Sequence, residues 1–252
     1  MVPLIDALDG RALLPWAVAG LMCTACKVYM PTLPHTPLVR EQGQAEAGVS
    51  VQLLGQGAAY GAYSPVKHLL VTASAATTIG RSGGESSSKN TQGDAGLSYY
   101  YTFGNDNRWY AGALASYGLA NTFSRYYMSG SPLKEYRARY SRYHGQLYLA
   151  RQGRRAVAYG AAVRLINLHF SSLTFNDAPV QEPVADLYGD WLLFLRVGKG
   201  AIQGQYQVGS SSPLNSVIRG DSDLFSKATL VGLSLIIRPH LLGHTRQAEQ
   251  QK

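Results

Sequence analysis

The chain has few charged residues, almost no cysteine and no long apolar run, and each shortage excludes a class of protein. Only 15% of its 252 residues are charged, against about a quarter in soluble domains. No stretch reaches about 18 apolar residues, which excludes crossing a membrane with helices. Cys23 and Cys26 both lie near the N-terminus, so the rest of the chain has neither a disulfide framework nor a thiol metal site.

Glycine and tyrosine are abundant instead, with 27 and 17 residues, and hydrophobic residues make up 46% of the chain. The mean hydropathy is −0.10, which is typical of a sheet with one wet and one apolar face. The net charge of +8 is spread along the chain. It fits either simple solubility or an anionic partner.

Residues 108–119 alternate between apolar side chains and small or polar ones. The odd positions carry the apolar set, which is Trp109, Ala111, Ala113, Ala115, Tyr117 and Leu119. A strand sends alternate side chains to opposite faces. Trp109 and Tyr117 are eight residues apart, which is about 21 Å of height in a tilted strand. Lipid-facing strands of outer-membrane barrels carry such a band between two aromatic girdles.

The same pattern recurs and predicts about ten strands. Their ranges are 45–53, 57–63, 68–78, 94–103, 108–119, 137–151, 155–168, 187–197, 201–209 and 227–238. An aromatic girdle is expected from outward rings at both edges of the apolar band, namely Trp109, Tyr117, Tyr99, Tyr101 and Trp191. We therefore predict an all-β fold, a closed up-and-down antiparallel transmembrane β-barrel over residues 44–239, followed by a polar tail at 240–252.

Short and long connections alternate along the chain. Short turns are expected at 64–67, 104–107, 152–154 and 198–200, and long polar stretches at 79–93, 121–136, 169–186 and 210–226. Outer-membrane barrels have short periplasmic turns and long outer loops. We therefore place the N-terminus and the short turns in the periplasm and the long stretches outside, with closure inferred because open sheet edges are too costly in lipid.

An alternative is a soluble lipocalin-like carrier, in which the apolar face surrounds an apolar ligand. Alternation alone does not separate the two. The apolar faces carry no Lys, Asp or Glu over their middles, and the opposite faces are rich in Gly, Ser, Ala and Gln. These features and the loop pattern favour the membrane.

The N-terminal residues resemble a secretory signal peptide followed by a lipidation motif. An apolar run at 12–22 is followed by small residues, which predicts a signal peptide over 1–25. Thr24 and Ala25 precede Cys26, the expected lipid-modified residue. Pro31, Pro34 and Pro37 then predict an extended, lipid-anchored linker over 26–43 that lies on the membrane outside the sheet. The alternative is a buried apolar helix with incidental cysteines.

Several short motifs resemble small outer-membrane β-barrel lipoproteins of Bacteroidetes. In that group a modified cysteine precedes a Tyr-x-Pro element, a Pro-Leu pair and an acidic-x-Gly entry into the first strand. The matching residues are Cys26, Tyr29, Pro31, Pro37, Leu38, Glu41 and Gly43, with further likeness at 139–143 and 231–235. The resemblance covers most of the chain and implies the location and the fold. It carries no biochemical activity.

The inner face of the predicted barrel collects polar and ionisable residues. The charged cluster is Glu46, Asp94, Arg108, Arg142, His144, Arg164, Asp190 and Arg196, joined by Gln146, Gln203, Gln205 and Gln207. Charges in a narrow lumen must pair or bind water. The cluster therefore predicts a structural filling of arginine–carboxylate pairs or, alternatively, a narrow pore for small solutes with a mild anion preference.

Basic and aromatic residues are interspersed between residues 125 and 143. This mixture can bind nucleic acid. Its expected place at an outer loop and strand top instead favours outer-membrane lipid and lipopolysaccharide phosphates, or a surface polysaccharide, as partners, and no nucleic acid. The alternative is a solvated loop with girdle tyrosines.

Signals for catalysis are weak. His144 and His169 lie near expected strand tops, with Ser141, Ser171 and Ser172 close by in sequence, but no spacing marks a triad. No metal-ligand spacing occurs. We expect a structural or surface-binding barrel without catalysis, cofactor or metal, while a barrel lipid hydrolase or protease stays open.

Overall fold

The computed structural model describes residues 28–53, 55–79, 82–83, 86–126, 133–153, 156–180, 185–215 and 227–242. The predicted signal peptide at 1–25 and the predicted lipidation site Cys26 lie outside these residues. Most of the predicted polar tail, from residue 243 onward, also lies outside them.

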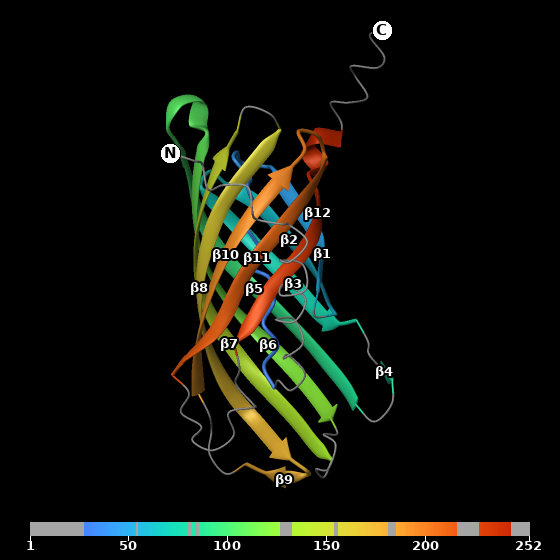
Figure 1. Cartoon of the computed structure of the whole chain (residues 1–252). Helices are drawn as coiled ribbons and strands as arrows, with labels where there is room; N and C mark the ends of the chain where they lie inside the picture. Colours follow the sequence, from blue (N-terminus) through green and yellow to red (C-terminus); the bar gives the residue numbers. More distant parts are fainter. Residues whose placement is uncertain are drawn as a thin grey trace, which may run out of the picture.

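Antiparallel strands close into one barrel (Figure 1). Its ten long strands in the described ranges are β1 (Ala45–Gln52), β2 (Gln56–Val66), β3 (Leu69–Thr78), β5 (Ser86–Phe103), β6 (Trp109–Tyr126), β7 (Lys134–Gln152), β8 (Val157–Phe175), β10 (Ala185–Val197), β11 (Ile202–Asn215) and β12 (Ala228–Ile237). The first and last strands pair from Ala47↔Ile237 to Gln52↔Gly232, which completes the closure. The predicted closed barrel of about ten strands is therefore confirmed.

Four short elements complete the described structure. The two-residue strands β4 (Ser82–Gly83) and β9 (Ala178–Pro179) pair with β5 and β8. The 3₁₀ turn η1 (Asn105–Asn107) joins β5 to β6, and η2 (Pro239–Leu241) follows β12. His240 Nδ1 of η2 lies 3.2 Å from the main-chain oxygen of Ala45, so the start of the predicted tail packs on the barrel.

The strands β5, β6, β7 and β8 are longer than expected, with 18 or 19 residues each. They extend well past the other strands at one end of the barrel (Figure 1). Parts of the polar stretches at 79–93, 121–136 and 169–186 are therefore strand. Their polar outward residues removed the apolar alternation from the sequence, but the main-chain pairing continues regardless of side-chain polarity.

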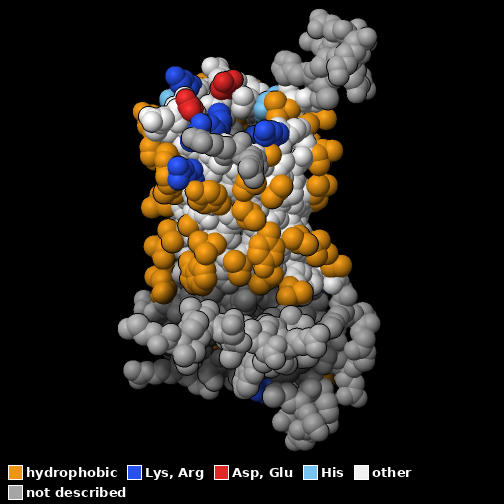
Figure 2. Space-filling view, turned by 45° about the horizontal axis from the view of Figure 1, so that its top comes forward, with side chains coloured by type: hydrophobic (Ala, Val, Ile, Leu, Met, Phe, Trp, Pro, Cys, Tyr) orange, Lys and Arg blue, Asp and Glu red, His pale blue; other side chains and the backbone are white. Residues whose placement is uncertain are grey.

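Apolar side chains cover the outside of the wall. Val49, Leu97, Leu147, Leu165 and Leu233 are all more than half exposed, and Figure 2 shows such side chains around the wall with charged ones gathered at one end. The inward positions are buried and largely polar. This arrangement contradicts the alternative of a lipocalin-like carrier, whose apolar face points inward. In the described ranges, no helix has the length and apolarity needed to cross a membrane.

The barrel has two distinct ends. We call the end with the connections β2–β3, β5–β6, β7–β8 and β10–β11 the short-turn end, and the opposite end the long-loop end. The β1–β2 connection at the long-loop end is short, at residues 53–55. Both β1 and β12 meet the short-turn end, where β1 begins and β12 finishes.

The described residues before β1 run through the interior of the barrel. Residues 28–42, which we call the threaded segment, have no strand pairing, and the blue start of the described chain passes among the strands in Figure 1. Val28, Tyr29, Leu33, Leu38 and Val39 are each at most 2% exposed. The predicted absence of sheet pairing is confirmed, but the prediction that this linker lies on the membrane is wrong for these residues.

Candidate functional site

The lumen holds the threaded segment through hydrogen bonds to its main chain. Eight carbonyl oxygens between residues 30 and 38 accept hydrogen bonds from side chains of the wall. These oxygens belong to Met30, Pro31, Thr32, Pro34, His35, Thr36, Pro37 and Leu38. The corresponding donors are Gln92, Gln52, Arg164, Gln207, Gln146, Arg196, Tyr148 and Arg238.

The proline spacing explains why this segment needs such donors. Pro31, Pro34 and Pro37 recur every third residue, the repeat of the polyproline II helix, which makes no internal hydrogen bonds. Proline also lacks an N–H to pair in a sheet. A buried carbonyl without a partner costs about 1–3 kcal/mol. The glutamine amides and guanidiniums of the wall replace the water that normally solvates this conformation.

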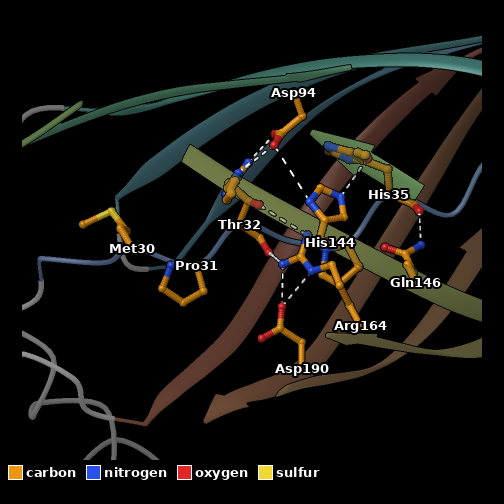
Figure 3. A network of polar contacts seen from close by, with 12 residues as sticks. Met30, Pro31, Thr32, His35, Asp94, His144, Gln146, Arg164 and Asp190 are labelled. Atoms are coloured by element: carbon orange, nitrogen blue, oxygen red, sulfur yellow. Dashed lines mark hydrogen bonds and ion pairs between the residues drawn. The ribbon is translucent and has the colours of Figure 1, made fainter. Parts of the chain in front are cut away.

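Buried ion pairs aim the arginines at the segment (Figure 3). Arg164 binds Asp190 from Nε at 2.9 Å and donates from Nη2 to the carbonyl oxygen of Thr32 at 2.5 Å. Arg142 pairs with both carboxylate oxygens of Asp94 and donates to Gln92 Oε1 at 2.6 Å. Each carboxylate thereby fixes the orientation of a guanidinium, whose remaining donors are then free to bind other groups.

Glu46 is the third carboxylate and joins several parts of the lumen. It accepts from Arg196 Nη1 at 2.8 Å, from Arg238 Nε at 3.2 Å and from the Tyr60 hydroxyl at 2.8 Å. It also lies 3.3 Å from the main-chain nitrogen of Leu38 in the threaded segment. Arg196 in turn donates to the Thr36 carbonyl at 2.8 Å. β1, β2, β10, the residue after β12 and the threaded segment therefore meet at one carboxylate.

Apolar contacts complete the fit of the segment. A Cβ on Gly232 would lie 2.4 Å from Leu33 Cδ1, so Leu33 occupies space that only glycine leaves free on β12. His35 stacks on Tyr60 with ring centroids 4.6 Å apart. Tyr29 lies against Tyr188, with centroids 4.5 Å apart. The lumen is therefore matched to particular side chains as well as to the main chain.

Most of the predicted lumen cluster is brought together. Glu46, Arg142, His144, Arg164, Asp190 and Arg196 are buried in the lumen, and the Asp94 side chain is only 6% exposed there. Arg108 is the exception, because it follows η1 at the short-turn end and pairs with Asp106 at 2.9 Å, with 36% of its side chain exposed. Its even position in the alternation suggested the lumen, but the strand starts one residue later.

Sequence reasoning missed four of the eight donors. Gln52, Tyr148 and Arg238 occupy inward positions of predicted strands, and this alternation was the available signal. Gln92 fell within the stretch 79–93, which was predicted to be a long connection. Their role was not evident because the segment they bind was assigned to the membrane surface. Gln203, which was expected in the lumen, donates to the carbonyl of Gly200 at 3.3 Å in the β10–β11 turn.

His144 lies in the lumen and not at a strand top. Its Nε2 is 3.0 Å from Ser116 Oγ, and its Nδ1 is 3.9 Å from Asp94 Oδ1. A Ser–His–Asp triad needs a hydrogen bond between its histidine and its carboxylate, and here that distance is too long while Arg142 occupies the carboxylate. Ser141, its expected neighbour, faces the outer side of β7 and is directly paired in register with His169 on β8.

The predicted girdle residues all lie on the outer face. Tyr99, Tyr101 and Trp191 are about half exposed, and Tyr117 is 45% exposed. Tyr117 pairs with Tyr143 at a ring distance of 4.9 Å toward the long-loop end. At the short-turn end, the rings of Trp109 and Phe103 stack with centroids 6.1 Å apart. The Arg151 guanidinium lies over the Trp109 ring, 5.3 Å from its centroid.

The region of interleaved bases and aromatics divides between two faces. Tyr136, Tyr140 and Arg142 point inward and are buried. We call the outward set the basic patch, which consists of Lys89, Arg125, Arg137 and Arg139 around a groove on β5–β8 beyond the apolar band. The guanidiniums of Arg125 and Arg137 each lie 5.7 Å from the Phe123 ring. Glu135 pairs with both arginines at 2.6 Å.

Within the described ranges, no group of three or more His, Cys, Asp or Glu side chains is placed to hold a metal ion. His240 contacts the main chain of Ala45.

Comparison with known proteins adds a likeness of fold only. No family model and no curated protein matches the chain. Among solved structures, the translocator domain of the autotransporter NalP from Neisseria meningitidis is similar, with 10% sequence identity and a TM-score of 0.47 over 91% of this chain and 92% of that chain. A likeness at this level carries no argument about function. The closed strand pairing and the apolar outer wall themselves define a β-barrel of the outer-membrane class.

Proposed function

We propose that this protein is a lipid-anchored barrel of the bacterial outer membrane, closed by its own N-terminal segment, with a structural or surface-binding role and no catalysis. The observation that carries the proposal is the set of eight main-chain carbonyls bound by the lumen wall. A solute pathway needs water-filled space, whereas here the wall donors are used on the chain itself.

The charges of the lumen support a filled interior over a conducting one. Four arginines (Arg142, Arg164, Arg196 and Arg238) face three carboxylates (Asp94, Asp190 and Glu46). The excess positive charge is offset by the carbonyl dipoles that the same guanidiniums bind. Charges removed from water are tolerated only when their partners are in place, so the ion pairs and the segment depend on one another.

The basic patch supports the surface-binding part of the proposal. It lies on the outer faces of β5, β6 and β7, past the Tyr117–Tyr143 pair, where a membrane protein meets the headgroup region. Cations at that height attract anionic headgroups. Lipopolysaccharide carries phosphates at this level, and the groove between Lys89, Arg137 and Arg139 offers them donors. The four cations of the patch exceed the two acids beside them, Glu135 and Asp177.

Planar-bilayer recording of the full-length protein tests the filled lumen. The expected result is no stepwise conductance in the wild type. The double variant R164A/R196A removes the guanidiniums that bind Thr32 and Thr36 and serves to detect a pore that these arginines line. Stepwise currents in the wild type whose size changes in the double variant would contradict the proposal and restore the narrow pore.

A further inference from the structure

The threaded segment runs from one end of the barrel to the other. At the short-turn end, Gly43 N donates to Ser64 O at 2.8 Å, Gln42 Nε2 to Pro65 O at 3.1 Å, and Arg40 Nη1 to Asn107 O at 2.6 Å. At the other end, Val28 and Tyr29 are buried in the apolar cluster that holds Tyr140, Phe170 and Tyr188. Phe170 and Tyr188 belong to the halves of β8 and β10 that lead to the long-loop end.

Val28 therefore lies near the long-loop edge of the apolar band. On the outer face of β6 and β7 the aromatic pair Tyr117–Tyr143 lies toward that edge. The inward residues of the Val28 cluster on the same strands, Ala120 and Tyr140, are three positions further along. Three residues of a tilted strand correspond to about 8 Å toward the long-loop end.

Beside Val28, the strand β1 reaches less far toward the long-loop end than β7 and β8 do. β1 ends at Gln52, whose side-chain amide already contacts the carbonyl of Pro31 at 3.4 Å. The segment continues from Pro31 back to Val28 in the direction of the long-loop end. Residues 28–30 therefore lie beyond the end of β1, while β7 and β8 continue past them on the opposite side of the lumen.

From this path we propose that the N-terminal end of the mature chain leaves the barrel on the long-loop side, and that the acyl chains of Cys26 enter the membrane leaflet of that side. This inference rests on the proposed function, because it uses the predicted lipidation. Cys26 is two residues from Val28, and two residues span at most about 7 Å. The leaflet on the short-turn side begins across a hydrocarbon core of about 25 Å. The filled lumen leaves no return path.

The outcome is a barrel that displays its own lipid anchor on the face of its long loops. It also fixes an order of assembly. A lipidated N-terminus does not pass through a lumen that is already filled, so the barrel closes around the segment. The seam between β1 and β12 lies beside Glu46, whose partners Arg196 and Arg238 also bind the Thr36 and Leu38 carbonyls. Closure of the seam and capture of the segment therefore share the same side chains.

Three versions of the full-length protein, each with one epitope tag flanked by Gly-Ser, test the proposal in cells of a Gram-negative host. One tag is inserted between Lys27 and Val28, one after Lys199 in the β10–β11 turn, and one within residues 216–226. Antibody binding is compared on intact and on permeabilised cells. Heat-modifiable migration selects the tagged proteins that fold, and K27C with an impermeant maleimide replaces the first tag if that insertion prevents folding.

We expect the tag at residue 27 and the tag at 216–226 to bind antibody on intact cells, and the tag at 199 only after permeabilisation. Exposure of the tags at 27 and 199 on the same side, or a K27C thiol labelled on the same side as the tag at 199, overturns the threading. If the tag at 199 binds antibody on intact cells and the tag at 27 binds only after permeabilisation, the threading is retained. That result would instead overturn the orientation of the barrel in the proposed function. Palmitate incorporation tests the lipid anchor, with C26S as the control that has no cysteine at position 26. If the wild type incorporates no more palmitate than C26S, only the lipid part of the proposal is overturned.

Discussion

Arg164 and Thr32 are 132 positions apart in the sequence, yet the Arg164 guanidinium donates to the Thr32 carbonyl oxygen at 2.5 Å in the middle of the barrel. The same guanidinium holds Asp190. One side chain thus links two requirements of the interior, which are the neutralisation of a buried carboxylate and the pairing of the main chain of the threaded segment.

Replacing Arg164 by alanine should destabilise the barrel by about 3–5 kcal/mol, because it leaves the Asp190 charge buried without its partner. The midpoint of urea unfolding in detergent micelles or vesicles measures this change. Arg108→Ala is the matched control, since its pair with Asp106 is exposed and such pairs contribute about 0–1 kcal/mol. Equal losses in the two variants would show that the lumen pair is not a structural element.

Gly232→Ala should cost about 1–3 kcal/mol through overpacking. The added Cβ would lie 2.4 Å from Leu33 Cδ1 and 2.9 Å from the Val51 carbonyl oxygen. Gly204→Ala is the control, because a Cβ there meets nothing within 4 Å. In the double variant L33A/G232A the combined loss should fall below the sum of the single losses. Strict additivity in the unfolding midpoints would argue against contact between Leu33 and β12.

An arginine on the outer wall should report depth in the bilayer. Leu165 is 57% exposed on β8 within the apolar band, so Leu165→Arg is expected to cost about 2–4 kcal/mol in vesicles, against about 0–1 kcal/mol near the interface. Asn121→Arg, on the outer face of β6 beyond Leu119, is the interfacial control. Folding free energies measured in phospholipid vesicles compare the two, and a smaller loss at 165 than at 121 would contradict the proposed membrane position.

Removal of three of the four cations of the basic patch should weaken binding of lipopolysaccharide. In the triple variant K89A/R137A/R139A, phosphate that co-purifies with the barrel is expected to fall about tenfold or more, since each cation near an anionic surface contributes about 1 kcal/mol. The triple variant K67A/R108A/R151A removes the same charge at the short-turn end. Phosphate analysis at several salt concentrations compares the two variants. If both retain the same amount of co-purifying phosphate, lipopolysaccharide binds at a place other than the basic patch.

Much of the barrel could be predicted from local pattern. The alternation at Trp109, Ala113 and Tyr117 identified both the strand and its outward face, because a strand exposes alternate residues whatever its partners. Pairing beyond the apolar band, as at Asn121↔Arg139, was not predicted. There the outward side chains are polar, and only the main-chain ladder extends the strands.

The position of the threaded segment required the tertiary structure. The prolines at 31, 34 and 37 indicated an extended chain without sheet pairing, and nothing in their spacing distinguishes a chain on a membrane from a chain inside a lumen. The donors that bind it, such as Gln207 and Tyr148, lie 173 and 111 positions away from their acceptors. Contacts at such separations leave no periodic signal in a single sequence.

The sequence by itself therefore determined which side of each strand meets the membrane and how short turns alternate with long loops. These properties depend on the order of neighbouring residues along the chain. Only the tertiary structure decided that the lumen is occupied, that Arg108 stays outside it and that Val28 is buried toward the long-loop end. These depend on closing the sheet into a ring, which sets the inner space and brings inward side chains from the whole chain around one segment.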